Sequence, residues 1–135
     1  MAIIRSFREL NVYLVARREA QVIFSRTRNF PPEERYALTD QIRRSSRAVK
    51  AMIAEAWGRR RYPAVFANKI DQALGEATET QSWLDDCLDS GYISAEEFAR
   101  MDGAWQSIGG MLNNMIARTD DFCRECQPAV LKDGD

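Results

Sequence analysis

The spacing of apolar residues constrains the fold of this chain more than any other feature of its sequence. Through four long segments, apolar residues recur every three or four positions, which is the spacing of one face of an α-helix. Alternation of apolar and polar residues, the pattern of a β-strand, never persists beyond about five residues. Proline and glycine fall between the segments, where they end one helix and begin the next. The pattern therefore predicts an all-α protein.

The predicted helices cover residues 7–28, 32–57, 64–89 and 94–126, and a short tail follows over 128–135. Gly58 and Gly91 are placed to end the second and third helices. Ser94 and Glu97 have the spacing of a capping box, so the fourth helix is expected to begin there. A chain of 135 residues has the size of one domain. Short connections between long helices favour an antiparallel up-down-up-down four-helix bundle over residues 1–127.

The first helix is apolar on two sides. Its predicted core stripe consists of Leu10, Tyr13, Leu14, Arg17, Ala20 and Phe24. A second stripe, well round the cylinder, consists of Val12, Val15, Ala16 and Ile23. A helix that is apolar on two sides has two surfaces to bury. We therefore expect the second stripe to be an interface with another copy of the chain.

Charge divides the chain into two halves. Residues 1–61 contain 14 Lys and Arg against 6 acidic residues, a net charge of +8. Residues 62–135 contain 5 Lys and Arg against 14 acidic residues, a net charge of −9. A basic half can bind an anionic partner, or it can pack against the acidic half of the same chain or of another copy.

The basic half contains a candidate nucleic-acid-binding surface on the second helix and in the turn after it. The predicted nucleic-acid-binding residues are Arg43, Arg44, Arg47, Lys50, Arg59, Arg60, Arg61 and Tyr62. Arg43, Arg47 and Lys50 follow the i, i+4, i+7 spacing of one helical stripe. Such cations neutralise phosphates, and Tyr62 beside Trp57 suggests stacking on exposed bases. The alternative is that carboxylates of the third helix, Glu76, Glu79, Asp85 and Asp86, neutralise these cations.

Two glutamates have structural and chemical interpretations. Glu55 and Arg59 are spaced i, i+4, which predicts an ion pair within one helix, and Glu79 is predicted to join the same structural set. A pair of carboxylates also suggests a magnesium site, but the ion-pair reading is favoured. A di-iron bundle requires histidine, and the chain has none.

The remaining residues offer little for catalysis. Without histidine the chain lacks the most common general base, and no enzyme activity, cofactor or metal is predicted. Three cysteines are too few for a four-ligand zinc site in one chain. Cys123 and Cys126 form one CxxC, read as two reduced thiols near the last helix, with a zinc shared between subunits as the alternative. The third cysteine is Cys87.

No apolar run is long enough to cross a bilayer, and the first residues lack the hydrophobic stretch of a signal peptide. The expected location is therefore the cytoplasm, without a membrane partner.

Several short motifs resemble those of one bacterial family. They are Phe30-Pro31-x-x-Glu34-Arg35-Tyr36-x-Leu38-x-x-Gln41-Ile42-Arg43-Arg44, Ser46-x-x-Val49-x-x-x-Ile53-Ala54-Glu55-Ala56-Trp57-Gly58-Arg59, Ala73-x-Gly75-x-x-x-Glu79-x-x-x-x-Leu84 and Gly91-Tyr92-Ile93. In order and spacing they resemble the four-helix bundle proteins encoded in intervening sequences of bacterial 23S ribosomal RNA genes. The resemblance extends from about Phe7 to Ile116. The chain departs from the family at Met52, where asparagine is usual, and at Glu76, where serine is common.

The resemblance implies a four-helix bundle that assembles into a barrel-like homopentamer without known catalytic activity. A relative, the accessory protein of diversity-generating retroelements, uses such a pentamer to bind nucleic acid and a reverse transcriptase. That relative is strongly basic, whereas this chain has a net charge of −1. This lower charge weighs against nucleic-acid binding, whereas the basic residues of the second helix and the resemblance favour it. From these two we expect a non-enzymatic oligomeric protein that binds RNA or DNA, and with it a nucleic-acid enzyme. The alternative is a protein-interaction scaffold whose basic half is neutralised by its acidic half.

Overall fold

The computed structural model describes residues 4–123, and this part of the chain is helical without any β-strand. Its elements are the 3₁₀-helices η1 (Phe7–Glu9) and η2 (Pro32–Glu34) and the α-helices α1 (Asn11–Thr27), α2 (Leu38–Gly58), α3 (Pro63–Asp89) and α4 (Ala95–Ala117). The prediction of an all-α protein is therefore confirmed. In residues 4–123, no helix is both long enough and apolar enough to span a membrane.

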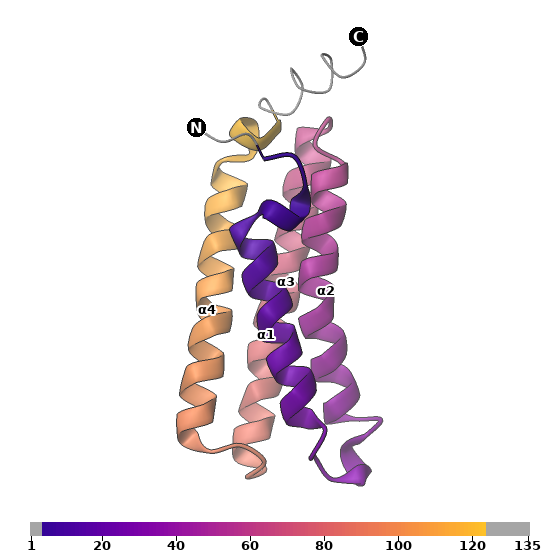
Figure 1. Ribbon diagram of the computed structural model, residues 1–135, viewed down its shortest axis with the longest axis vertical. Helices are drawn as coiled ribbons and strands as arrows, with labels where there is room; N and C mark the ends of the chain where they lie inside the picture. The colour runs from indigo at the N-terminus through magenta and orange to yellow at the C-terminus, as the bar shows by residue number, and fades with distance from the viewer. Residues whose placement is uncertain (1–3, 124–135) are drawn as a thin grey trace.

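The four α-helices lie side by side as an elongated bundle, and the chain reverses direction at each connection (Figure 1). In this view α1 lies in front of α3, with α4 on one side and α2 on the other (Figure 1). α2 packs extensively against α3, and α3 against α4, whereas α1 contacts α2 and, less extensively, α4. α1 and α2 together therefore form one continuous face of the molecule.

All four helices supply the core. Ile23 of α1, Ile53 of α2, Phe66 of α3 and Trp105 of α4 are fully buried. Side chains of this size remove most apolar surface from water and contribute most of the stability of a bundle.

The orientation of α1 differs from the prediction. Val12, Ala16 and Ile23, predicted to contact another copy, are only 6%, 0% and 0% exposed and belong to the core of their own chain. Val15 is half-buried. A side chain buried in its own core cannot contact a second copy, so the first three are core residues rather than interface residues.

The cause of this difference is the position of the large apolar side chains on α1. Leu14 is 44% exposed and Arg17 is exposed, although both belong to the predicted core stripe. The core side follows Tyr13, Ala16 and Ala20 instead. Val12 and Ile23 are buried on this side as well, so the core side of α1 lies between the two predicted stripes and takes residues from both.

Two hydroxyl groups join α2 and α3 inside the core. Ser45 Oγ and Thr80 Oγ1 lie 2.8 Å apart, and neither residue is exposed to solvent. Each hydroxyl also lies within reach of a backbone carbonyl oxygen of its own helix, Thr80 of Glu76 at 2.9 Å and Ser45 of Ile42 at 3.4 Å. Because a buried hydroxyl without a partner is costly, this pair contributes to the fit of α2 against α3.

The turn between α3 and α4 has the chemistry expected from its sequence. Gly91 has a φ of +76°, and the N–H of Tyr92 donates to the carbonyl oxygen of Cys87 at 2.9 Å. This is the glycine-dependent ending of a helix in which the chain turns left-handed. Ser94 and Glu97 then form the predicted capping box, with both reciprocal hydrogen bonds present.

Three helix ends differ from the predicted bounds. α1 begins after the extended residue Leu10, and α2 begins at Leu38 because Ala37 leaves the helical conformation (φ −119°, ψ −107°). α4 ends at Ala117, where Arg118 interrupts it, and helical residues resume over 119–123. The predicted end of the fourth helix at residue 126 lies outside the described residues.

An ion pair fastens the end of α1 to the start of α4. Arg26 Nε lies 2.6 Å from Glu97 Oε2, and Arg26 Nη2 also donates to the carbonyl oxygen of Tyr92 at 2.7 Å. The side chains of Arg26 and Glu97 are 31% and 26% exposed. The hydrogen bond from Arg26, with a further one from the backbone of Ser94, lowers the pKa of Glu97 to about 2. The carboxylate therefore stabilises the fold only while it is ionised.

We expect this ion pair to make stability depend on pH between about 4.5 and about 2. Because folding lowers the pKa of Glu97, its contribution is fully present above the unfolded value and disappears as pH falls through the folded value. A charged hydrogen bond of this kind contributes about 1–3 kcal/mol. Thermal unfolding of wild-type protein and of Glu97→Gln, measured from pH 6 to pH 2, should therefore converge at the acidic end. Glu96→Gln, at an exposed neighbour without an ion pair in the described chain, should keep the wild-type profile. Parallel curves for wild type and Glu97→Gln would contradict this role.

Candidate nucleic-acid interface

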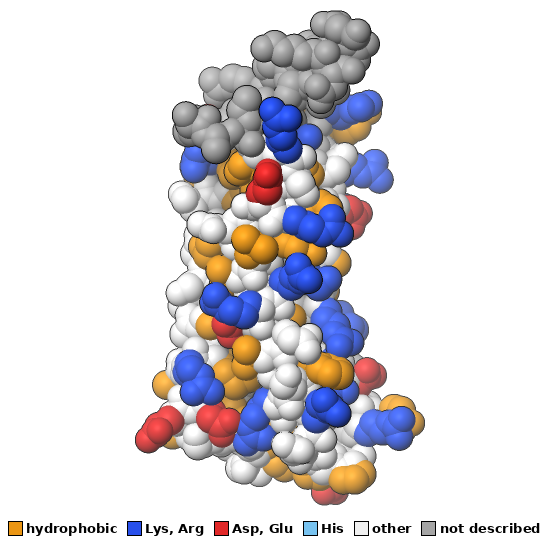
Figure 2. Space-filling model, in the orientation of Figure 1, with side chains coloured by type: hydrophobic (Ala, Val, Ile, Leu, Met, Phe, Trp, Pro, Cys, Tyr) orange, Lys and Arg blue, Asp and Glu red, His pale blue; other side chains and the backbone are white. Residues whose placement is uncertain are grey.

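Basic side chains cover the face that α1 and α2 form. Figure 2 shows Lys and Arg scattered along the length of this face, with few Asp or Glu among them. Between α1 and α2 run five cations that we call the basic seam. The basic seam consists of Arg17 and Arg28 at the edge of α1 and of Arg43, Arg47 and Lys50 on α2. Three of the predicted nucleic-acid-binding residues are therefore brought together with two arginines that the prediction missed.

An aromatic ring holds two of these arginines in place. The guanidinium carbons of Arg43 and Arg47 lie 4.6 Å and 4.9 Å from the centre of the Phe24 ring. Arg43 also donates through Nε to Thr27 Oγ1 at 2.8 Å. Cation–π contacts of this kind stabilise by about 0.5–2 kcal/mol and leave the edges of the guanidinium able to donate hydrogen bonds. Phe24 therefore orders two cations at the surface without neutralising them.

Within the described part of the chain, the cations of the basic seam have no carboxylate partner. In residues 4–123, none of the five forms an ion pair. The pKa of the Arg43 guanidinium is lowered, first by burial and then by the nearby charges of Arg47 and Arg28, whereas Asp40 acts in the opposite direction. Like charges held close together repel each other, and a bound anion would relieve that repulsion.

Arg44 differs from the other arginines of α2. It lies 2.5 Å from Glu79 and 3.4 Å from Glu76, and Glu79 also accepts a hydrogen bond from Trp83 Nε1 at 3.1 Å. The carboxylates of α3 therefore neutralise Arg44, as the alternative interpretation of the sequence proposed, but they do so for this one member of the predicted set.

The predicted set of Glu55, Arg59 and Glu79 is not brought together. Glu55 pairs with Lys69 of α3 at 2.9 Å, and Glu79 pairs with Arg44. Arg59 forms no ion pair with any described residue. Interhelical contacts replace the expected pair within α2, because the cations of the neighbouring helix lie closer. Glu55 and Glu79 thus have separate cationic partners and do not form a two-carboxylate site.

The turn after α2 adds cations at one end of the seam. Arg59 and Arg61 are exposed, and no described carboxylate pairs with them. Arg60 lies over the half-buried Trp57, with its guanidinium carbon 3.6 Å from the ring centre. Arg61 lies over Tyr62 at 6.0 Å, and Tyr62 is 52% exposed. The turn therefore extends the basic surface. Tyr62 is more accessible than Trp57, which lies in the last turn of α2.

The described cysteines and acidic residues were also candidates for chemistry or for a metal site. Burial raises the pKa of the Cys87 thiol to about 12, so this group stays protonated at neutral pH. Over residues 4–123, no group of three or more His, Cys, Asp or Glu is positioned to hold a metal ion. Cys123 is buried, and the predicted CxxC partner Cys126 lies outside the described residues.

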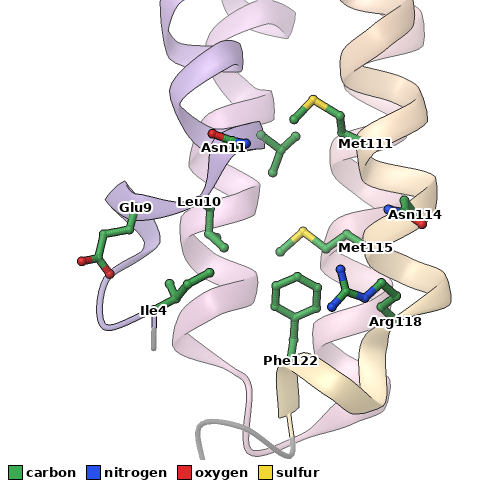
Figure 3. A pocket seen from close by; sticks show the side chains of 10 residues that line it. Ile4, Glu9, Leu10, Asn11, Met111, Asn114, Met115, Arg118 and Phe122 are labelled. Carbon is green, nitrogen blue, oxygen red and sulfur yellow. The ribbon is translucent and has the colours of Figure 1, made fainter. Parts of the chain in front are cut away.

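A hollow lies between the start of α1 and the end of α4. It has a volume of about 400 Å³, and Leu10, Met115 and Phe122 lie around it (Figure 3). Its charged neighbour Arg118 pairs with Asp121 at 3.3 Å. This lining is mostly apolar, so it differs in chemistry from the basic seam.

The described chain is thus an all-helical bundle with one face of unneutralised cations. Its sequence matches the family described as 23S rRNA-intervening sequence protein over residues 8–114, and the chain belongs to that family. A similar solved structure is a protein of unknown function from the S23 ribosomal protein family of Bacteroides thetaiotaomicron VPI-5482. That structure is 28% identical, has a TM-score of 0.71, and the match covers 78% of this chain and 95% of that one. No curated protein matches the chain. The family resemblance noted from the sequence motifs is confirmed.

Proposed function

We propose that this protein is a non-enzymatic oligomeric binding protein that binds RNA or DNA through the basic seam and the adjoining Arg59 and Arg61. The observation that carries the proposal is the absence of carboxylate partners for the seam cations among the described residues, while Arg44 and Arg26 on the same helices are paired. Cations that remain available can each neutralise a phosphate and release its condensed counterions. A nucleic-acid enzyme as a further partner is part of the same proposal.

The non-enzymatic part of the proposal is supported by the side chains present. The chain has no histidine, and the Cys87 thiol is buried and protonated. The most common general base and the most reactive type of nucleophile are thus not offered by these residues, which supports binding through charge as the chemistry of residues 4–123.

The steep salt dependence of electrostatic binding provides the test. If about four phosphates are neutralised, affinity for a labelled 20-nucleotide RNA or DNA should fall about 100-fold between 50 mM and 200 mM NaCl. Fluorescence anisotropy measures this directly. Arg100→Gln, which removes an exposed cation of α4, should leave both affinity and salt slope nearly unchanged. Binding that is undetectable at 50 mM, or that is indifferent to salt, would exclude this function.

We also propose that copies assemble into a ring, a homopentamer by the family resemblance, in which each copy is an antiparallel up-down-up-down four-helix bundle. The outer face of α1 supports this part of the proposal, because the exposed Leu14 and the half-buried Val22 lie there in a hollow whose other lining residues are polar or charged. Exposed apolar residues grouped on one face mark interaction surfaces. Leu14→Ser together with Val22→Ser should therefore give smaller particles in sedimentation velocity. Particles of wild-type size would place the contact elsewhere.

A protein-interaction scaffold is the second candidate, and the acidic helix α3 favours it. Asp71, Asp85, Asp86 and Asp89 are exposed and pair with no cation within the described chain. A basic protein partner could dock on such a surface. Failure of the salt titration would make this the leading function.

A further inference from the structure

We infer that the basic seam binds double-stranded nucleic acid through the phosphates of both strands, without stacking on bases. This inference rests on the proposed function and specifies its ligand. The shared chemistry is the pair of phosphate rows that borders a groove of either a DNA or an RNA duplex. Three observations support it. The aromatic rings already contact arginines, the cations lie in two rows on neighbouring helices, and Phe24 holds two of the arginines in place.

Two aromatic rings beside the basic seam already contact arginines. Phe24 is half-buried and carries two guanidiniums, and Trp57 is half-buried beneath Arg60. Proteins that bind single strands instead offer open aromatic faces on which successive bases stack. Tyr62 is 52% exposed and lies at one end of the seam, so it can accept one base at most. The rings therefore serve to position arginines, and arginines recognise phosphates.

The cations form two rows rather than one. On α2, Arg43, Arg47 and Lys50 extend over roughly 10 Å at 1.5 Å per residue. On α1, Arg17 and Arg28 share the face of Phe24 over roughly 16 Å. Packed helices have axes about 8–10 Å apart. Because Arg43 and Arg47 reach across to Phe24 of α1, the charged ends of the two rows lie closer together than the helix axes.

A duplex matches such an array better than a single strand does. It presents one phosphate row on each side of a groove, and about five base pairs span the roughly 16 Å of the longer row at roughly 3.4 Å per pair. A single strand presents one row, so it would leave half of the cations without a phosphate. Arg43 and Arg47 are also held in place by Phe24. A stiff duplex loses little freedom on a fixed array, whereas a flexible strand must be ordered at a cost in entropy.

The test compares four probes of one non-self-complementary sequence of 20 nucleotides: single-stranded DNA, duplex DNA, single-stranded RNA and duplex RNA. Competition anisotropy at 100 mM NaCl should show at least one duplex binding about 10-fold more tightly than its own single strand. That factor corresponds to the steeper counterion release of duplexes when about five phosphates are neutralised. Comparison of the RNA duplex with the DNA duplex shows which of the two the basic seam binds more tightly.

A ring substitution checks the absence of stacking. Tyr62→Leu should change duplex affinity less than twofold, because phosphate contacts do not use the ring. Single strands that bind as tightly as duplexes, or a large loss of affinity in Tyr62→Leu, would overturn the inference while leaving the proposed function intact. Absence of binding to all four probes at 50 mM NaCl would overturn both.

Discussion

Replacing Ile23 with alanine is expected to lower the free energy of unfolding by about 2–5 kcal/mol. Ile23 is fully buried in the core, although the sequence pattern placed it at a contact between copies. Removing its side chain deletes buried methyl and methylene groups and leaves a cavity that neighbouring helices fill only in part. Small domains are stable by only about 5–15 kcal/mol, so this loss is a large fraction of the total.

Urea denaturation followed by circular dichroism measures the effect of Ile23→Ala. Val65→Ala is a matched control, because Val65 is 39% exposed and lies near the start of α3. Its effect should stay within about 0.5 kcal/mol, as for most surface substitutions. Equal midpoints for the two variants would show that Ile23 does not belong to the folded core of a single copy.

Removing three cations of the basic seam should nearly abolish nucleic-acid binding. At 0.1 M salt, the release of about 0.9 counterion per phosphate corresponds to roughly 8-fold in affinity for each contact. Arg28→Gln, Arg47→Gln and Lys50→Gln combined should therefore weaken duplex binding by roughly 500-fold and reduce the salt slope by nearly three. Anisotropy titrations at several salt concentrations give both quantities.

Net charge alone would produce a smaller effect, and a second triple variant distinguishes the two causes. Arg5→Gln, Arg35→Gln and Arg100→Gln remove the same number of charges at exposed positions outside the seam, none of which has an ion pair within the described chain. This control should bind within a few-fold of wild type. If both triple variants lose affinity equally, binding depends on total charge and not on the seam. Glutamine favours helix, so circular dichroism should be unchanged in both.

The sequence predicts what depends on spacing within one helix. The all-α class, the capping box at Ser94 and Glu97, and the helix ending at Gly91 each follow from local residue types, and the structure contains all three. The stripe of Arg43, Arg47 and Lys50 follows from the helical period in the same way.

The sequence does not predict what depends on contact between helices. Phe24 meets Arg43 and Arg47 only because α1 and α2 pack side by side in a particular register. Glu55 pairs with Lys69 rather than with Arg59 for the same kind of reason. The rotation of α1 was missed because its buried side lies between the two predicted apolar stripes and takes residues from both. Arg17, Phe24 and Arg28 share the i, i+7, i+11 spacing of one helical face, so this part of the basic seam could be predicted from the sequence.

The buried hydroxyl pair of Ser45 and Thr80 has a consequence for the charged surface outside it. Moving α2 along α3 by one residue would separate the two oxygens, now 2.8 Å apart, and leave them without each other inside the core. The pair therefore favours one register of α2 against α3. The same alignment sets Arg44, next to Ser45, opposite Glu76 and Glu79. A small polar contact in the interior thus selects which arginine of α2 is neutralised and which face keeps its positive potential.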